Sequence, residues 1–180
     1  MKIVVLAAGT STEREVSIVS GTEVCKALRS RGHQAILVDV FFGKEGADPA
    51  TAFDGDYDVD VEAAYISSFN AQVKDAVASG REFFGPGVIE LCKAADVVFM
   101  ALHGANGEDG RVQAYFDLCG IPYTGTGYLS SAMAMDKGIT KKIFRTSGVP
   151  TPRGVELKKG KDSMNLADYN MELPVVVKTC

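Results

Sequence analysis

The chain opens on a short β-branched apolar run that turns at a glycine and leads directly into a helical pattern. Residues 3–6 (IVVL) predict a buried strand that Gly9 closes, and residues 17–31 place apolar or small side chains at helical spacing. Gly32 follows at the position where a left-handed helix C-cap is expected. A strand, a tight loop and a helix in this order predict the first unit of a parallel α/β sheet.

The same opening invites a signal-peptide interpretation, because Lys2 precedes the apolar run. Only residues 3–8 are apolar before polar and charged residues intervene, which is at or below the short limit for a signal-peptide core. We therefore prefer the interpretation as a first buried strand. No run approaches the roughly 18 apolar residues of a membrane helix, so no membrane partner is expected.

The strand and helix pattern repeats farther along the chain. Residues 34–40 (QAILVDV) form an apolar run without clean alternation, as in a sheet that is covered on both faces. Residues 96–102 predict a third strand between helices at residues 86–95 and 109–119, and PYTGTG adds a short strand and turn. This order predicts an α/β fold whose ligands bind outside the carboxyl ends of parallel strands.

Residues 43–85 interrupt this pattern. The segment is acidic, and its glycines and prolines break any period, so we expect loops with one short helix and one short strand. Its run DGDYDVDVE superficially resembles a calcium loop, but the glycine and closing glutamate of that motif fall at the wrong offsets. We interpret the segment as a solvated surface insertion.

Charge and cysteine content narrow the partners. The net charge of −4, with no basic cluster, argues against a nucleic-acid partner and leaves small neutral or zwitterionic ligands open. Cys25, Cys92, Cys119 and Cys180 are scattered and form no C-x-x-C pair. This pattern indicates reduced thiols in a cytoplasmic protein rather than a disulfide framework or a zinc site.

The character of the sequence changes after Tyr128. LSSAMAMDKGITKKIFRTSGVPTP predicts a lysine-rich helix that Gly148 and Pro150 end, and RGVELKK and LPVVVKTC predict two strands. A last strand with one partner and no evident core indicates an incomplete second domain. We therefore expect one domain over residues 1–128 and the start of another over residues 129–180.

An acid occupies the first loop, where an α/β protein often binds phosphate. Thr10-x-x-Glu13 and Thr12-x-x-Glu15 both fit a capping box, so Glu13 either caps its own helix or receives a positively charged group. The residues alone leave both possibilities open. Arg14 beside it is interpreted as an exposed helix residue.

The loop ALHGANGEDG follows the third predicted strand. His103 is the first residue after that strand, and Gly104 and its neighbouring glycines permit positive φ and close backbone approach. Such a histidine can donate a hydrogen bond to a carboxylate or an oxyanion, or it can simply brace the loop. Glu108 and Asp109 are interpreted as charges that cap the next helix.

Two lysines complete the candidate set. Lys137 lies within AMAMDKGITKK, and Lys178 ends the apolar run PVVVK. Lysine is a point-charge donor suited to phosphate, but neither lysine alone specifies ATP.

Together these motifs resemble those of the D-alanine–D-alanine ligase family of ATP-grasp enzymes. The matching segments, in chain order, are AGTSTEREVSIVSG, ALHGANGEDG, PYTGTG, SAMAMDK and PVVVK. The resemblance covers the chain apart from residues 43–85 and implies a Rossmann-like N-terminal domain followed by the beginning of an ATP-grasp α+β domain. AAGTS replaces the double glycine usual in the family, and KTC stands where many members have lysine and then proline.

The resemblance also implies an activity, the ATP-dependent ligation of two D-alanines through an acylphosphate for peptidoglycan synthesis. In it Glu13 holds the ammonium group of the first D-alanine, Val16 lines the methyl pocket, and His103 with Gly104 lies beside the carboxylate. Glu13 and His103 would then be the catalytic residues.

The resemblance assigns ATP phosphate contacts to Lys137 and Lys178. It implies Mg²⁺ as a further cofactor, with ligands expected beyond Cys180, and it implies that residues 1–180 alone are inactive. Family members are commonly dimeric, so a homodimer is a further expectation. Two alternatives remain open: a non-catalytic amino-acid-binding α/β module, and a D-alanine–D-lactate ligase.

Overall fold

The computed structural model describes residues 1–178, which form two compact units that divide after Ala132. In the first unit, three parallel strands pair in the order β2-β1-β3, with bounds β1 Lys2–Ala7, β2 Gln34–Asp39 and β3 Val97–Met100. Val4 of β1 lies opposite Ile36 of β2 and Val98 of β3. Beyond β3 the predicted short strand is a single parallel bridge between Val98 and Tyr123.

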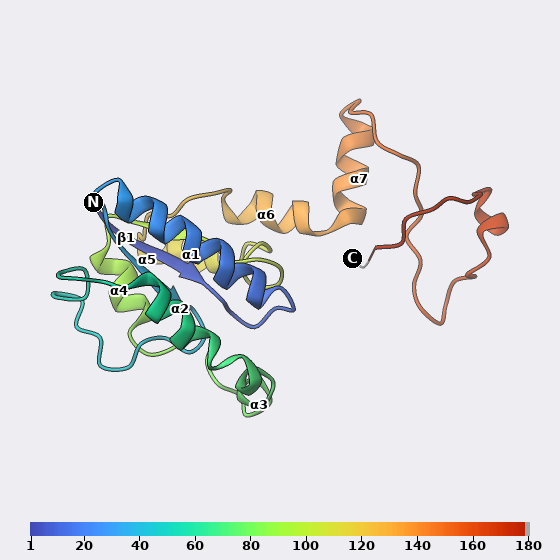
Figure 1. Cartoon of the computed structure of the whole chain (residues 1–180). Helices are drawn as coiled ribbons and strands as arrows, with labels where there is room; N and C mark the ends of the chain where they lie inside the picture. Colours follow the sequence, from blue (N-terminus) through green and yellow to red (C-terminus); the bar gives the residue numbers. More distant parts are fainter. Residues whose placement is uncertain (179–180) are drawn as a thin grey trace. The chain divides into compact units, whose positions relative to one another are not determined.

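Helices cover both faces of this sheet (Figure 1). The helices of the first unit are α1 Arg14–Ser30, α2 Val59–Ser67, η1 Asn70–Gln72, α3 Val73–Ala78, α4 Val88–Ala94 and α5 Arg111–Cys119, and α6 Tyr128–Met135 follows. Side chains of α1 and α2 pack against one face of β1, and those of α4 and α5 pack against the other. Within residues 1–178, every helix is too short or too polar to traverse a lipid bilayer.

The near-continuous apolar strands are explained by this two-sided burial. Successive β1 residues point to opposite faces, so Val5 enters the core under α1 while Val4 and Leu6 enter the core under α4 and α5. All three side chains are fully buried. The predicted parallel α/β architecture is therefore confirmed.

The α1 helix approaches the sheet closely at Gly21. A methyl group built on Gly21 would lie 2.9 Å from Ala7 Cβ and 3.1 Å from Leu37 Cδ1. Ile18 and Cys25, one turn before and one turn after, are buried on the same side of the helix. A small residue at position 21 thus sets the distance between α1 and β1.

The acidic segment is more integrated than the sequence suggests. It forms α2, η1 and α3, and no strand is found there among the described residues. Phe53, Val59 and Ile66 are buried, and the Tyr57 hydroxyl donates to Leu37 O and accepts from Leu37 N at the open edge of β2. The aspartates of the run 54–62 are exposed, as expected of a solvated surface segment, whereas its sparse apolar residues reach the core.

The cysteines of the first unit are free thiols, as the sequence predicts. Burial raises the pKa of Cys25 to about 11 and that of Cys92 to about 12, so both thiols stay protonated at neutral pH. Cys119 is only partly buried.

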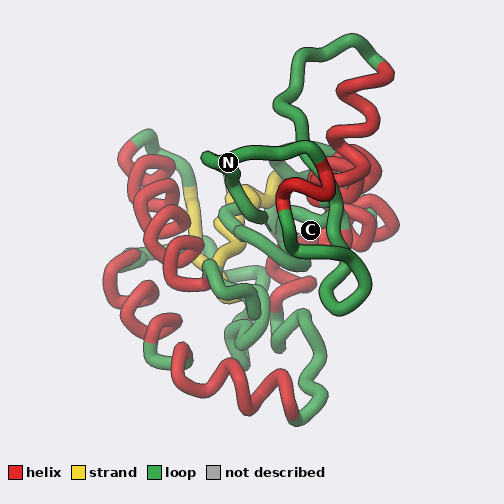
Figure 2. The backbone as a smooth tube through the Cα atoms, turned by 90° about the vertical axis from the view of Figure 1, so that its right-hand side faces the viewer, coloured by secondary structure: helices red, strands yellow, loops and turns green. Residues whose placement is uncertain are grey.

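The second unit begins with the last residues of α6 and contains α7 Lys137–Thr146 and η2 Leu166–Tyr169, and the rest of its described chain is loop (Figure 2). The lysine-rich helix predicted after Tyr128 is divided at Asp136, whose side chain caps α7 by accepting from Ile139 N. The strands predicted at RGVELKK and LPVVVK are not formed, and Thr179 and Cys180 lie outside the described residues. An extended segment becomes a strand only when a neighbour accepts its backbone hydrogen bonds, and none is found in residues 133–178.

The close approach at Gly21 predicts a stability effect. Gly21→Ala should lower the free energy of unfolding by about 1–2 kcal/mol, because overpacking against Ala7 exceeds the helix-propensity gain of about 1 kcal/mol. Urea unfolding measures the change, with the exposed Glu23→Ala on the same helix as a near-neutral control. A stabilised Gly21→Ala variant would contradict the packing argument.

Candidate functional site

The loops that follow β1 and β3 lie side by side at the carboxyl edge of the sheet. The Ser11 hydroxyl donates to His103 O at 2.7 Å, and the Ser17 hydroxyl donates to Ala101 O at 2.7 Å. Ser17 Oγ also accepts from Ala8 N at 2.7 Å. Two serines of the first loop and helix therefore tie this region to the end of β3.

Glu13 occupies the N-cap position of α1, and its side chain makes no capping hydrogen bond. Ser11 organises the turn instead, since its Oγ accepts from Glu13 N at 3.2 Å and its carbonyl accepts from Arg14 N at 3.2 Å. Both predicted capping boxes were wrong, because the helix begins at Arg14, later than a cap at Thr10 or Thr12 requires. The Glu13 carboxylate is thus not used as a cap.

The Glu13 carboxylate lies against the second loop. A methyl group built on Gly104 would stand 2.9 Å from Glu13 Oε2 and 3.1 Å from Ser11 Cβ. Gly104 has φ +71°, a conformation that favours glycine. The structure therefore brings together two of the residues predicted for the site, Glu13 and Gly104.

His103 is held between α1 and the loop that precedes α5. The Ser20 hydroxyl donates to Val16 O at 2.9 Å, and its oxygen also lies within hydrogen-bond distance of Nε2 of His103, at 3.1 Å. Nδ1 of the same ring lies 3.9 Å from Glu108 Oε1. The half-exposed imidazole is therefore held between a hydroxyl and a carboxylate.

The acidic pair of this loop divides its roles. Glu108 Oε2 accepts from Gly104 N at 2.7 Å, so Glu108 braces the loop and does not cap α5 as predicted. Asp109 Oδ1 accepts from Arg111 N at 3.2 Å, which fits the predicted position at the start of the helix. The N-cap residue of α5 is Gly110, with φ +89°. Glu108 is therefore not the cap, and its other carboxylate oxygen lies near His103.

The first loop is conformationally constrained. Ala8 has φ +68° and Gly9 has φ +87°, although an L-residue in the left-handed region costs roughly 1 kcal/mol or more. Ala8 stands at the first position of the double glycine that the resemblance leads us to expect, and Gly9 at the second. Contacts from outside the loop must stabilise this conformation.

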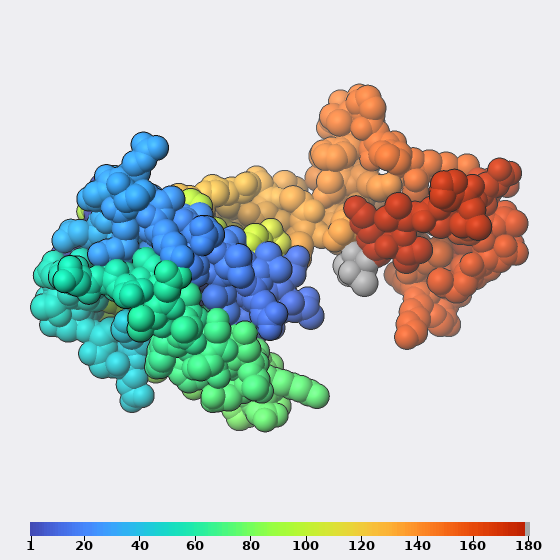
Figure 3. All heavy atoms as spheres, viewed as in Figure 1, coloured from blue at the N-terminus to red at the C-terminus, as the bar shows by residue number. Residues whose placement is uncertain are grey.

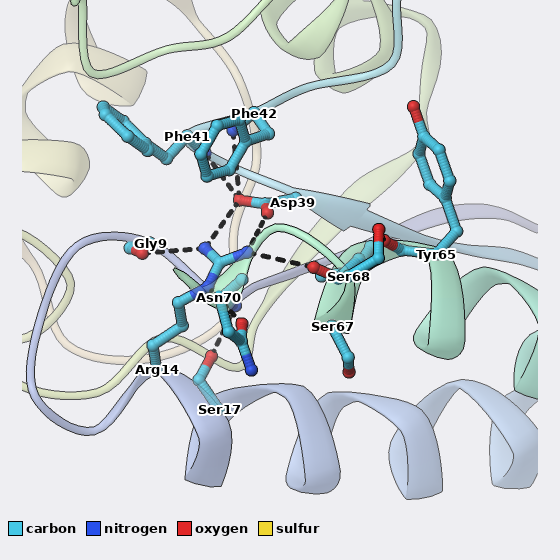
Figure 4. Close-up of polar contacts among 12 residues, drawn as sticks. Gly9, Arg14, Ser17, Asp39, Phe41, Phe42, Tyr65, Ser67, Ser68 and Asn70 are labelled. Atoms are coloured by element: carbon cyan, nitrogen blue, oxygen red, sulfur yellow. Dashed lines mark hydrogen bonds and ion pairs between the residues drawn. The ribbon is translucent and has the colours of Figure 1, made fainter. Parts of the chain in front are cut away.

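Arg14 is buried and not an exposed helix residue, so that interpretation was wrong. Its side chain turns away from solvent under the first turn of α1 and pairs with Asp39 at the end of β2 (Figure 4). Only 5% of Arg14 and 1% of Asp39 are exposed.

Sequence reasoning also missed Ser11 and Ser20, because no local pattern reveals contacts between residues 83 or 92 positions apart.

The remaining predicted residues are placed differently. Val16 is exposed on the first turn of α1, and the outer face of this helix is open to solvent (Figure 3, blue). Lys137 begins α7, and Lys178 is exposed in a loop. Both lysines belong to the second unit, whereas Glu13 and His103 belong to the first.

A metal site is not assembled from the described residues. Between residues 1 and 178, no group of three or more histidine, cysteine, aspartate or glutamate side chains is arranged to hold a metal ion. The acids near His103 instead contact backbone amides and the imidazole.

These features define a class of protein: a parallel α/β domain whose candidate ligand site lies at the carboxyl edge of its sheet. The chain belongs to the D-alanine–D-alanine ligase family. The family's model, described as the D-ala D-ala ligase N-terminus, matches residues 2–126.

Curated relatives agree with this membership. The chain is 41% identical to the D-alanine–D-alanine ligase of Lacticaseibacillus casei over 99% of its own length and 50% of the relative's. It is 40% identical to that of Pediococcus pentosaceus, covering 99% of this chain and 52% of the relative. The chain therefore spans about half the length of the curated relatives it matches.

Solved structures show the same fold. A D-alanine–D-alanine ligase from Bacillus anthracis, complexed with ATP, aligns with TM-score 0.60 at 29% identity over 94% of this chain and 44% of the other. The ligase from Coxiella burnetii aligns with TM-score 0.61 at 21% identity, covering 94% and 49%. The latter likeness concerns the fold alone.

The contact between Glu13 and Gly104 predicts unequal costs at two glycines. Gly120→Ala, at φ +65° with open space around it, should lose about 1 kcal/mol of stability through backbone strain alone. Gly104→Ala, at φ +71°, should lose about 1–3 kcal/mol more, because its methyl group displaces Glu13 and Ser11. Denaturant unfolding compares the pair, and equal losses would contradict the close approach.

Proposed function

We propose that this chain supplies the amino-acid-binding part of an ATP-dependent D-alanine–D-alanine ligase of peptidoglycan synthesis. In the proposed reaction the first D-alanine carboxylate takes the γ-phosphoryl group of ATP, releasing ADP. The amine of the second D-alanine then attacks the acylphosphate and displaces phosphate. Family membership supports the activity, and the position of the Glu13 carboxylate is the observation that supports the assignment of the site.

Glu13 is the proposed receptor for the ammonium group of the first D-alanine. Its carboxylate has no capping bond, faces the Gly104 backbone and lies at the start of α1. A carboxylate there would repel a phosphate but attract a cation, and glycine at position 104 leaves space for close approach. Val16 is exposed on the first turn of α1, and we propose that it contacts the methyl group of this D-alanine.

His103 is proposed to lie beside the D-alanine carboxylate. Its Nε2 lies 3.1 Å from the Ser20 hydroxyl oxygen and its Nδ1 lies 3.9 Å from Glu108 Oε1, so these two residues fix the orientation of the ring. An imidazole N–H at this position would donate a hydrogen bond to the carboxylate as a phosphoryl group approaches. Glu13 and His103 then orient opposite ends of one zwitterion.

The phosphate contacts are proposed for Lys137 and Lys178, as the family resemblance implies. Each carries one compact positive charge suited to a phosphate oxygen. Among residues 1–178, no group of three or more histidine, cysteine, aspartate or glutamate side chains is arranged to bind Mg²⁺. We therefore assign the metal to none of these side chains. The division into domains at residues 1–128 and 129–180 also remains a prediction.

A cytoplasmic location and a homodimer complete the proposal. Free thiols at Cys25, Cys92 and Cys119 support a reducing compartment. The family supports D-alanine and ATP as partners, and the net charge of −4 disfavours nucleic acid.

Binding of D-alanine tests the role of Glu13. Glu13→Gln should raise the dissociation constant for D-alanine about 10–100-fold, because a charge-assisted hydrogen bond to ammonium is lost. NMR titration of the chain measures the affinity, and Glu15→Gln, an equal charge change two residues away, should change it by less than about twofold. Equal affinity in the wild-type chain and Glu13→Gln would contradict the assignment.

Phosphate release tests the proposed reaction in the protein encoded by the complete reading frame. We expect release of phosphate from ATP only when D-alanine is present, with D-alanyl-D-alanine formed in equal amount. Turnover of ATP that does not depend on an amino acid would contradict a ligase. If the protein is instead a D-alanine–D-lactate ligase, addition of D-lactate should yield D-alanyl-D-lactate.

A further inference from the structure

Arg14 uses every hydrogen-bond donor of its guanidinium in the interior of the first unit. Nε donates to Asn70 Oδ1 at 2.8 Å, and Nη1 donates to Gly9 O at 2.8 Å and Asp39 Oδ1 at 3.3 Å. Nη2 donates to Asp39 Oδ2 and to Ile66 O at 3.2 Å. Figure 4 shows the guanidinium between the first loop, β2 and the segment after α2.

Asp39 is itself fixed, so the ion pair is a rigid attachment. Its Oδ1 also accepts from Phe41 N at 2.9 Å and Phe42 N at 3.2 Å, which closes the turn after β2. The Phe42 ring lies 5.4 Å from the Arg14 guanidinium and stacks on Phe69 with centroids 4.7 Å apart. Arg14 therefore cannot move without disturbing several packed groups.

The carbonyl of Gly9 is the contact that reaches the candidate site. Ala8 and Gly9 both have positive φ, so the loop is in a conformation that must be held from outside. Arg14 holds the Gly9 carbonyl, and Ser17 holds the Ala8 amide. In the sequence, Glu13 is four residues after Gly9 and directly precedes Arg14.

We propose that Arg14 is a positioning residue for Glu13: its buried guanidinium fixes the strained 8–13 loop so that the Glu13 carboxylate faces Gly104. Arg14 itself contacts no ligand, since its side chain points into the interior while that of Glu13 is exposed. The inference rests on the proposed function where it concerns D-alanine. The effect on the loop stands on geometry alone.

Lysine at position 14 separates positioning from simple charge pairing. Arg14→Lys keeps one positive charge beside Asp39, which avoids leaving a buried carboxylate unpaired. Three donors on one nitrogen cannot reach Gly9 O, Asp39 and Asn70 in the directions that the planar guanidinium uses. The variant should therefore retain the fold and release the loop.

The experiment measures amide hydrogen exchange and D-alanine affinity in the same 180-residue chain. In Arg14→Lys, exchange at the amides of Glu13 and Ser17 should accelerate about tenfold while that of Val4 and Val5 stays unchanged. The dissociation constant for D-alanine should rise about tenfold. Asn70→Ala removes only the acceptor of Nε and should shift both quantities about threefold in the same direction.

Lys44→Gln is the matched control. Lys44 Nζ pairs with Glu62 Oε2 at 2.6 Å, so the variant loses a charge pair to α2 without touching the loop. We expect loop exchange and D-alanine affinity within about twofold of wild type. A control that matched Arg14→Lys would show a general effect of loosening α2 and overturn the proposal.

The outcomes separate this inference from the proposed function. Unchanged exchange at Glu13 and Ser17 in Arg14→Lys overturns the positioning role, as does uniform acceleration that includes Val4 and Val5. Faster loop exchange with unchanged D-alanine affinity also overturns it. If the wild-type chain binds no D-alanine, the proposed function fails for this chain, and loop exchange alone decides the role of Arg14.

Discussion

The parallel pairing of β1 with both β2 and β3 is the constraint on which the site depends. Parallel strands in one sheet end at the same edge, so the loop after β1 and the loop after β3 must emerge together. Glu13 and His103 are 90 positions apart in sequence, yet serine hydroxyls join their loops within hydrogen-bond distance. Burial on both faces of the sheet fixes this arrangement.

Charge is distributed unevenly at that edge. Glu13 and Glu108 are acids exposed toward the site, whereas the cation Arg14 is turned inward and neutralised by Asp39. The ammonium group of the proposed ligand would therefore meet Glu13 without competition from the neighbouring guanidinium. The inward arginine has a structural task instead, since it joins the first loop to β2 and to the segment that follows α2.

Local pattern was sufficient for much of the fold. The apolar runs and helical spacing predicted β1, β2, β3, α1, α4 and α5 within a few residues. Prediction succeeded there because the pattern of apolar and polar side chains within each element shows which of its faces are buried. The family resemblance assigns Glu13 and Gly104 to one site, which stays a prediction, and the two residues lie against each other. Prediction failed for Arg14 and the capping boxes, where the outcome depends on residues such as Asp39 and Ser11 that tertiary structure brings near. It failed for PVVVK because a strand requires a partner.

Direct observation of where D-alanine lies tests the central claim most directly. Isotope-filtered NOE spectra of the chain with ¹³C-methyl D-alanine report which protons lie beside the ligand. If the first D-alanine binds at the carboxyl edge of the sheet, cross-peaks should connect the ligand to Glu13, Val16 and the His103 ring. Cross-peaks confined to residues 133–178, or to the opposite end of the sheet, would contradict it.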